Sequence, residues 1–326
     1  MKINSFAKRL SCFIVAVIFV AMSFNASAAN LSQGASFSDQ AHIYEVLPGE
    51  NEWNSMTVGE RLDACYVGEE EAANMTTDAL VETVLNYPYL INIYAYNSLE
   101  EGIAMVSEHF SGLNELLSRT ECAQKLQSFL VENHDSHSVN NIDTKQFMAQ
   151  RLYEYALDTS SNSIDLARAQ VGYVYTPKHT RVTASYNLTW ADTKLTEQEA
   201  NAINQSMLKT YPGVSLLRSA NPSYNCHSYA WHSTSSSNKY WINDPTAYTT
   251  DGSYFSSFSK SPNKITYKQL SDGSIIHSGI VTSSSGKPTV VTSKWGALGL
   301  FSHAKANCPY NVDKYGSLSY GYWEAS

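Results

Sequence analysis

Charged residues are scarce in this chain. Lysine, arginine, aspartate and glutamate make up 16% of the 326 residues, and the formal net charge is −8. An acidic chain without a cluster of lysine and arginine is a poor ligand for the phosphates of nucleic acids or anionic lipids. We therefore expect no nucleic acid among its partners. Serine, threonine, asparagine and tyrosine are abundant instead, which is typical of exported proteins with neutral polar surfaces.

Long apolar runs are missing after residue 28, and the run near the N-terminus is short. Residues 12–24 are apolar and follow a basic stretch, and Ala26-Ser27-Ala28 then offers a small-x-small cleavage site. This order is typical of a secretory signal peptide, and the apolar run is too short for a stable membrane span. We predict a signal peptide at residues 1–28, a secreted mature protein and no integral membrane span.

Cysteine is rare as well. Cys12 would leave with the signal peptide, so the mature chain would keep Cys65, Cys122, Cys226 and Cys308. Four cysteines in an exported protein can form two disulfides, in three possible pairings. A disulfide between Cys226 and Cys308 therefore stays open as the alternative to a free, reactive thiol at Cys226.

The pattern of apolar residues divides the mature chain. Residues 29–57 are polar, and we expect a loose lead-in there. In residues 58–170 apolar side chains recur at helical spacing, which predicts a domain of roughly four to six helices. Residues 171–326 are rich in β-branched and aromatic residues and in turn signals, which predict short strands. One further helix is predicted after Thr196, which forms a capping box with Glu199. The expected fold class is α+β.

A short helix is predicted for residues 224–231, which read Tyr-Asn-Cys-His-Ser-Tyr-Ala-Trp after a turn signal. Cys226 would lie in its first turn. Backbone N–H groups and the helix dipole stabilise a thiolate at such a position, so Cys226 is a candidate nucleophile. Tyr224 and Asn225 directly precede it and are candidate substrate-binding residues.

A base for this cysteine is offered by His277, which lies in a predicted strand. Gly279 would share the face of His277 and leave space for a helix to approach. The turn at 283–288 predicts a hairpin whose second strand would bring Ser293 near His277, where a hydroxyl can hold an imidazole in one tautomer. His303, at the end of a later strand, is the alternative third residue or base.

These motifs, taken in order, resemble the papain-like cysteine peptidase superfamily. The segment that begins at Ser293 is similar to the Asn-Ser-Trp-Gly segment of papain, with Ser293 in place of the orienting asparagine and Trp295 in place of the tryptophan. The interval of 51 positions from Cys226 to His277 resembles the compact NlpC/P60 and CHAP amidases and endopeptidases. The resemblance covers about 221–303, and the motifs together are similar to those of a group of exported Gram-positive bacterial proteins.

The resemblance implies a papain-like domain in which a helix packs on an antiparallel sheet. It further implies a secreted hydrolase that cleaves amide bonds of peptides or peptidoglycan without a metal or other cofactor. Cys226 would attack the carbonyl, His277 would activate the thiol and protonate the leaving amine, and Ser293 would orient His277. Trp295 would shield the site from water, and Tyr224, Asn225 and Trp295 would contact the substrate. The alternative is a secreted, non-catalytic binding protein that retains the papain-like shell.

Overall fold

The computed structural model describes residues 37–133, 144–161, 170–257, 263–282, 289–311 and 318–326. The predicted signal peptide at 1–28 lies outside the described residues, so its presence stays a prediction. Within the described ranges, no helix combines the length and the apolar character needed to cross a bilayer.

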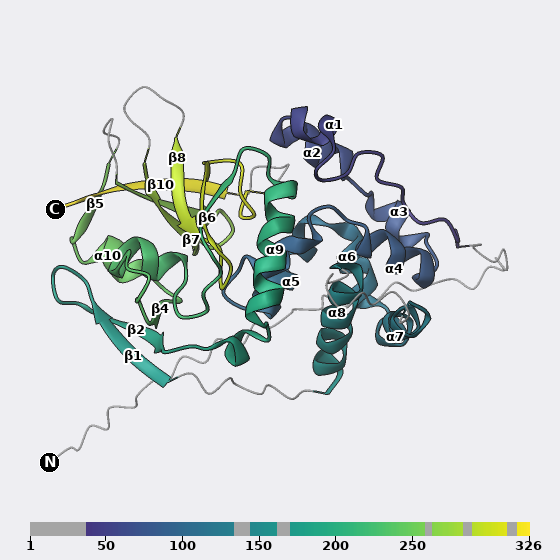
Figure 1. Ribbon diagram of the computed structural model, residues 1–326, viewed down its shortest axis with the longest axis horizontal. Helices are drawn as coiled ribbons and strands as arrows, with labels where there is room; N and C mark the ends of the chain where they lie inside the picture. The colour runs from purple at the N-terminus through teal and green to yellow at the C-terminus, as the bar shows by residue number, and fades with distance from the viewer. Residues whose placement is uncertain (1–36, 134–143, 162–169, 258–262, 283–288, 312–317) are drawn as a thin grey trace, which may run out of the picture. The chain divides into compact units, whose positions relative to one another are not determined.

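Helices fill the first half of the described chain (Figure 1). They are α1 (Asn51–Ser55), α2 (Val58–Ala64), α3 (Glu69–Ala73), α4 (Thr77–Leu85), η1 (Leu90–Tyr94), α5 (Leu99–His109), α6 (Ser111–Ser118), α7 (Cys122–Glu132) and α8 (Thr144–Ser161). Local sequence explains several of their ends. The side chain of Thr76 accepts the N–H of Ala79 and so begins α4. The extended backbone of Phe110 separates α5 from α6.

Strands fill the second half and form two antiparallel sheets (Figure 1). The strands are β1 (Gln170–Tyr175), β2 (Arg181–Tyr186), β3 (Ser215–Arg218), β4 (Tyr240–Trp241), β5 (Tyr254–Ser256), β6 (Lys264–Gln269), β7 (Ile275–Val281), β8 (Val290–Lys294), β9 (Leu300–Ala304) and β10 (Leu318–Ala325). The helical pieces among them are η3 (Trp190–Thr193), α9 (Glu197–Thr210), the π-helical turn η4 (Ser228–His232) and α10 (Thr246–Thr250). One sheet has the order β1-β2-β4 and the other β3-β9-β8-β7-β6-β10-β5. The expected α+β class is confirmed.

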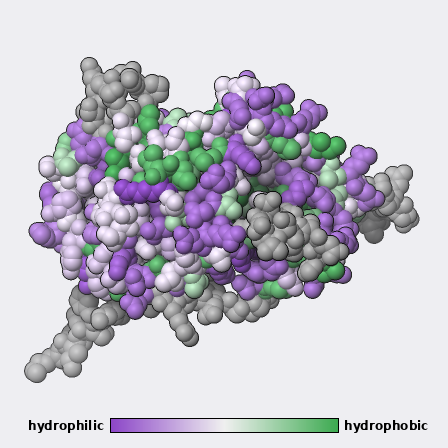
Figure 2. Space-filling model, in the orientation of Figure 1, coloured by the Kyte–Doolittle hydropathy of each residue, from purple (hydrophilic) through white to green (hydrophobic). Residues whose placement is uncertain are grey.

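One hydrophobic core joins the helices to the larger sheet. Leu80 and Ile103 from the helices belong to the same cluster of buried side chains as Val291 and Phe301 from the sheet. Hydrophilic residues cover most of the face shown in Figure 2. The described residues from 37 to 326 accordingly make one compact unit. The helices thus cover one face of the larger sheet.

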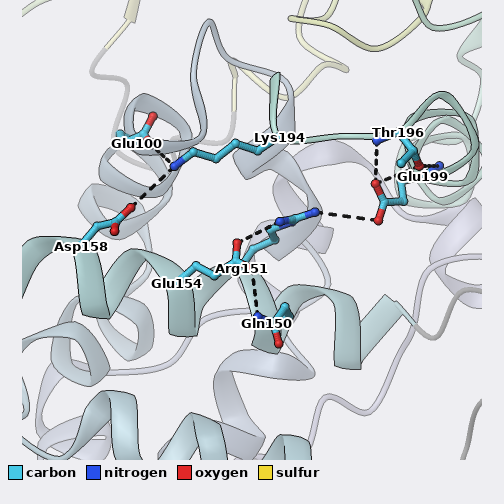
Figure 3. Close-up of polar contacts among 8 residues, drawn as sticks. All are labelled: Glu100, Gln150, Arg151, Glu154, Asp158, Lys194, Thr196 and Glu199. Atoms are coloured by element: carbon cyan, nitrogen blue, oxygen red, sulfur yellow. Dashed lines mark hydrogen bonds and ion pairs between the residues drawn. The ribbon is translucent and has the colours of Figure 1, made fainter. Parts of the chain in front are cut away.

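Polar contacts also tie α8 to α9, which lies between β2 and β3 in the chain (Figure 3). Arg151 on α8 contacts Glu154 at 2.8 Å and Glu199 on α9 at 3.8 Å. Glu199 is the residue of the predicted capping box, and that box is formed. The N–H of Glu199 donates to Oγ1 of Thr196 at 3.2 Å, and the N–H of Thr196 donates to Oε2 of Glu199 at 2.7 Å.

Trp53 anchors α1 in this core, although the sequence predicted a loose lead-in for this part of the chain. Its side chain is 0% exposed, and its indole N–H donates to the carbonyl of Thr210 at 3.1 Å. The next helix, α2, is also attached to the second half of the chain, because the guanidinium of Arg61 donates to Oδ1 of Asn307 at 3.0 Å. A polar composition therefore hid the buried aromatic side chains of Trp53 and Tyr44.

We expect Trp53→Ala to lower the free energy of unfolding by about 3–5 kcal/mol, because it leaves a large cavity and an unpaired carbonyl. Urea unfolding followed by circular dichroism measures this loss. Ile43→Ala, at a side chain that is 80% exposed, is the control and should change stability by less than about 0.5 kcal/mol. A loss below about 1 kcal/mol for Trp53→Ala would mean that α1 is only loosely attached.

Candidate active site around Cys226

Cys226 opens a short helical segment that continues into η4, and Asn225 caps that segment. Oδ1 of Asn225 accepts the N–H groups of Ser228 at 3.0 Å and Ile242 at 3.2 Å. Its amide nitrogen donates to Oδ1 of Asn97 at 2.8 Å and to the carbonyl of Ile242 at 2.6 Å. Both donors and both acceptor positions of the amide are therefore used. Asn225 holds Cys226 in place, and nothing on its side chain is left for the substrate contact that the sequence suggested.

The sulfur of Cys226 lies where the pairing between β7 and β8 ends. In the described residues these strands pair at Val281↔Val291 and Ile280↔Thr292. The N–H of Val281 donates to Asn263 on the β6 side at 3.1 Å, so alternation along the strand turns the N–H of Ser278 toward β8. There the N–H of Ser278 is directed at the sulfur of Cys226. The N–H of Ser278 thus acts on the thiol where β7 no longer pairs with β8.

Burial decides the protonation state of this thiol. Burial raises the pKa of Cys226 to about 12, and the nearby Glu101 carboxylate acts in the same direction. The backbone N–H groups of Ser278, His227 and Cys226 itself lower the pKa because they hydrogen-bond the sulfur. Cys226 is a thiol in the arrangement described, and these three N–H groups are in place to hold its thiolate once it forms.

A disulfide from Cys226 to Cys308 is not formed. The four cysteines of the described chain are all free and buried, namely Cys65, Cys122, Cys226 and Cys308. Instead, the thiol of Cys308 donates to the carbonyl of Lys305 at 3.6 Å.

His277 lies in an aromatic layer on the face of the sheet that the helices cover. Its ring stacks on Tyr310, with centroids 3.6 Å apart and planes 13° apart, and meets Tyr267 at 5.1 Å. The side chain is fully buried, and in the described structure neither ring nitrogen has a hydrogen-bond partner. Burial, followed by the charges of His303 and His227, holds the pKa of His277 well below its usual value. The imidazole is therefore neutral.

The helical segment packs on the other face of β7, opposite to the face that the sequence suggested. Oγ of Ser278 contacts Nδ1 of His227 and accepts the indole N–H of Trp231, each at 2.9 Å. Successive side chains of a strand point to opposite faces, so η4 lies on the face away from His277. Gly279 leaves no space for a helix, since a Cβ there would lie 2.3 Å from Cγ1 of Val291.

Tyr310 neighbours both His277 and Cys226. Its ring stacks on His277, and its electrostatic neighbours include Cys226 on the other side. Its hydroxyl donates to the carbonyl of Ala95, at the end of η1. Ser278, which follows His277 directly, supplies the N–H for the sulfur. Tyr310 is therefore the side chain that the thiol and the imidazole have in common as a neighbour.

Ser293 does not orient His277. Its hydroxyl lies 2.8 Å from Nε2 of His303 and accepts the indole N–H of Trp295 at 3.1 Å. Nδ1 of His303 donates to the carbonyl of Ala304 at 2.9 Å, so its Nε2 accepts from Ser293. The reason is the register, because β8 pairs with β9 along its whole length but leaves β7 before it reaches His277. Ser293 and the alternative third residue, His303, are thus bonded to each other.

Tyr224 and Trp295, the other residues expected to contact a substrate, are buried. Tyr224 is 1% exposed and packs with Tyr229 and Leu300, while Trp295 is fully buried and stacks on Phe301 at 4.0 Å. A pocket of about 180 Å³ lies elsewhere, between α4, η1, α8 and α9. In the arrangement described, neither residue lines an open cleft.

Sequence reasoning missed two members of the site. Tyr310 lies 33 positions after His277 and no motif marks it, so only the fold could reveal the stacking. Lys294 sits inside the Ser-Lys-Trp-Gly segment and reads as an ordinary surface lysine, yet it is fully buried. The available signal was strand alternation, which places Lys294 on the face opposite to Ser293. Alternation assigns a side chain to one face of a sheet, but it does not say how deeply that side chain is buried.

The comparisons with known proteins give no relative for this site. No protein-family model matches the chain, and no curated protein and no solved structure matches it either. Among the described residues, no three histidine, cysteine, aspartate or glutamate side chains are grouped so that they could hold a metal ion. The chemistry of the site has to be argued from its own geometry.

We expect Ser293→Ala to lower the free energy of unfolding by about 1–3 kcal/mol, because the buried groups of His303 and Trp295 lose their shared partner. Urea unfolding measures the loss, and Ser256→Ala on exposed β5 is the control. Unchanged stability in Ser293→Ala would contradict the hydrogen-bond network described here.

Acid should destabilise the protein through its buried histidines. Burial lowers the pKa of His303 to about 4 and that of His227 to about 3, so each gains a proton on unfolding between those values and about 6.5. Stability contributed by the neutral rings is therefore present near pH 7 and is lost as the pH falls below about 6.5. At pH 5 each costs about 2 kcal/mol of folding free energy.

The variant His303→Gln isolates one of these contributions. Its stability should fall by about 2 kcal/mol less than that of the wild type between pH 7 and pH 5, measured by urea unfolding at both values. Equal losses in both proteins would show that His303 is already protonated in the folded state.

Proposed function

We propose that the protein is an exported, cysteine-dependent amide hydrolase of papain-like architecture, acting on peptides or peptidoglycan. The observation that carries the proposal is the imidazole of His277. Both of its nitrogens are buried without partners in the described structure, next to the residue whose N–H is directed at the sulfur of Cys226. Buried polar groups without partners are rare and costly, and a catalytic role is one reason for a protein to keep them.

The reaction would follow from the two side chains and the surrounding N–H groups. His277 accepts the proton of Cys226, and the thiolate attacks the amide carbonyl carbon. The backbone N–H groups of Cys226 and His227 stabilise the oxyanion that develops. His277 then donates its proton to the leaving amine, and a water molecule hydrolyses the thioester to release the acid and restore the thiol.

Neutral His277 suits this role because it can accept a proton. Its stacking on Tyr310 keeps the ring in one plane, which is the task that an orienting hydrogen bond performs in other Cys–His pairs. Ser293 takes no part in the proposed step, since its hydroxyl is bonded to His303. Cys226 is only 1% exposed, so the residues that bury the thiol have to move before a substrate reaches the pair.

The burial of the pair favours one alternative. A secreted binding protein that retains the shell without catalysis would also keep Cys226 and His277 inside. Export itself rests on the signal-like pattern at residues 1–28, and the preference for peptides or peptidoglycan rests on the resemblance of the motifs.

We expect wild-type protein to release amine groups from peptides or purified peptidoglycan, and Cys226→Ser to release none. His277→Ala should lower turnover by about 10²–10⁴, the usual contribution of a general base. His303→Gln is the matched control, a buried histidine of the same sheet that should retain turnover. Alkylation by iodoacetamide at pH 6, read for each cysteine peptide by mass spectrometry, checks the pair independently of substrate.

The alkylation experiment separates the two functions. A hydrolase should label Cys226 faster than Cys65, Cys122 and Cys308, and this advantage should vanish in His277→Ala. If Cys226 reacts no faster than the other three, and His277→Ala changes nothing, the binding protein is the better description.

A further inference from the structure

Lys294 is the unusual side chain of this site because it is fully buried and charged. Its Nζ donates to the carbonyls of Asn221 at 2.7 Å, Gly296 at 3.0 Å and Leu298 at 2.5 Å. Three donated hydrogen bonds require all three hydrogens of an ammonium group, whereas a neutral amine has only two. The geometry therefore describes a buried cation held by backbone dipoles.

The three carbonyls belong to two turns that meet beside Cys226. Asn221 starts the turn that leads into Cys226, while Gly296 and Leu298 lie in the turn between β8 and β9. The N–H of Asn221 also donates to the carbonyl of Ala297 at 3.0 Å. The ammonium thus closes a clamp between the turn before the nucleophile and the turn after β8.

The turn between β8 and β9 is held in place by the chain that follows η1. Gly296 has a φ of +50°, and a Cβ there would lie 2.3 Å from the carbonyl oxygen of Tyr96. The turn therefore rests against the chain that follows η1 and needs a glycine to do so. Lys294 therefore joins Asn221, five residues before Cys226, to a turn that is packed against the chain after η1.

Lys294 also lies within electrostatic range of Cys226. Burial lowers the pKa of Lys294 to about 7, and the negative charge of a Cys226 thiolate raises it. The other groups that face this pair are Tyr224, whose ring lies 5.1 Å from Nζ of Lys294, and Glu101 and Tyr310, which act on Cys226. His277 adds no charge, because burial keeps it neutral.

We infer that Lys294 is a positioning residue for Cys226: its ammonium clamps the turn that carries the nucleophile and balances the charge of the thiolate. This inference rests on the proposed function, in which the thiolate of Cys226 is the attacking group. The part played by charge distinguishes it from a lysine that merely fills the structure. A charge effect must disappear when the ammonium loses its proton, whereas a packing effect does not depend on pH.

Lys264 provides a matched control. It is a partly buried lysine, its Nζ donates to the carbonyl of Ala230 within η4, and burial lowers its pKa to about 8. The electrostatic neighbours of Lys264 do not include Cys226. Lys264→Met and Lys294→Met both remove a lysine that binds backbone carbonyls, and only the second removes a cation coupled to the nucleophile.

The experiment measures the alkylation rate of Cys226 by iodoacetamide between pH 5.5 and pH 9 in the full chain, resolved by peptide mass spectrometry. At pH 6 we expect wild-type protein to react about tenfold faster than Lys294→Met, the effect of one opposite charge near an ionisable group. The ratio should fall toward one above about pH 8, as Lys294 of the wild type loses its proton. Lys264→Met should react like the wild type at every pH.

Two results would overturn the inference: a ratio near one throughout, or a lowered rate that does not change with pH. If Lys294→Met fails to fold by circular dichroism, Lys294→Gln keeps two N–H donors without the charge and replaces it. Wild-type protein alone gives a third reading, since the slope of log rate against pH should drop below one between about pH 7 and 8. The readout is alkylation, so a failed hydrolase shows itself separately, as labelling that does not depend on His277.

Discussion

The opening between β7 and β8 is the constraint on which the site depends. A continuous ladder would use the N–H of Ser278 within the sheet, and no sulfur could reach it. Because the pairing ends at Ile280, the N–H of Ser278 is left to act on the thiol of Cys226. One face brings the helical segment that carries Cys226, and the other brings His277 with Tyr310.

The three residues that follow η1 in the helical half support the site directly. Asn97 receives the amide of Asn225, and the carbonyl of Ala95 receives the hydroxyl of Tyr310. Gly296 rests against the carbonyl of Tyr96. A stretch of three residues after η1 therefore touches the cap, the aromatic cover and the turn that holds the buried lysine. The geometry of the nucleophile is set as much by this stretch as by the sheet.

Local signals in the sequence predicted local structure well. The capping box at Thr196 and the strand around His277 both stand where side-chain chemistry and alternation placed them. The partners across the sheet could not be read in this way. Alternation placed Ser293 on the face of His277, but where two strands stop pairing depends on tertiary packing, and this point gave Ser293 to His303. Trp53 was missed for a similar reason, since one buried side chain outweighed a polar segment.

The hydrogen bond from Tyr310 to Ala95 spans 215 positions of the chain. A ribosome adds residues from the N-terminus at about 5–20 per second, so Ala95 waits roughly 10–40 s for this partner. During that interval the helices emerge with the side that later receives the sheet still exposed to water. Final packing of the first half is therefore a late event in biosynthesis, completed only when nearly the entire polypeptide has left the ribosome.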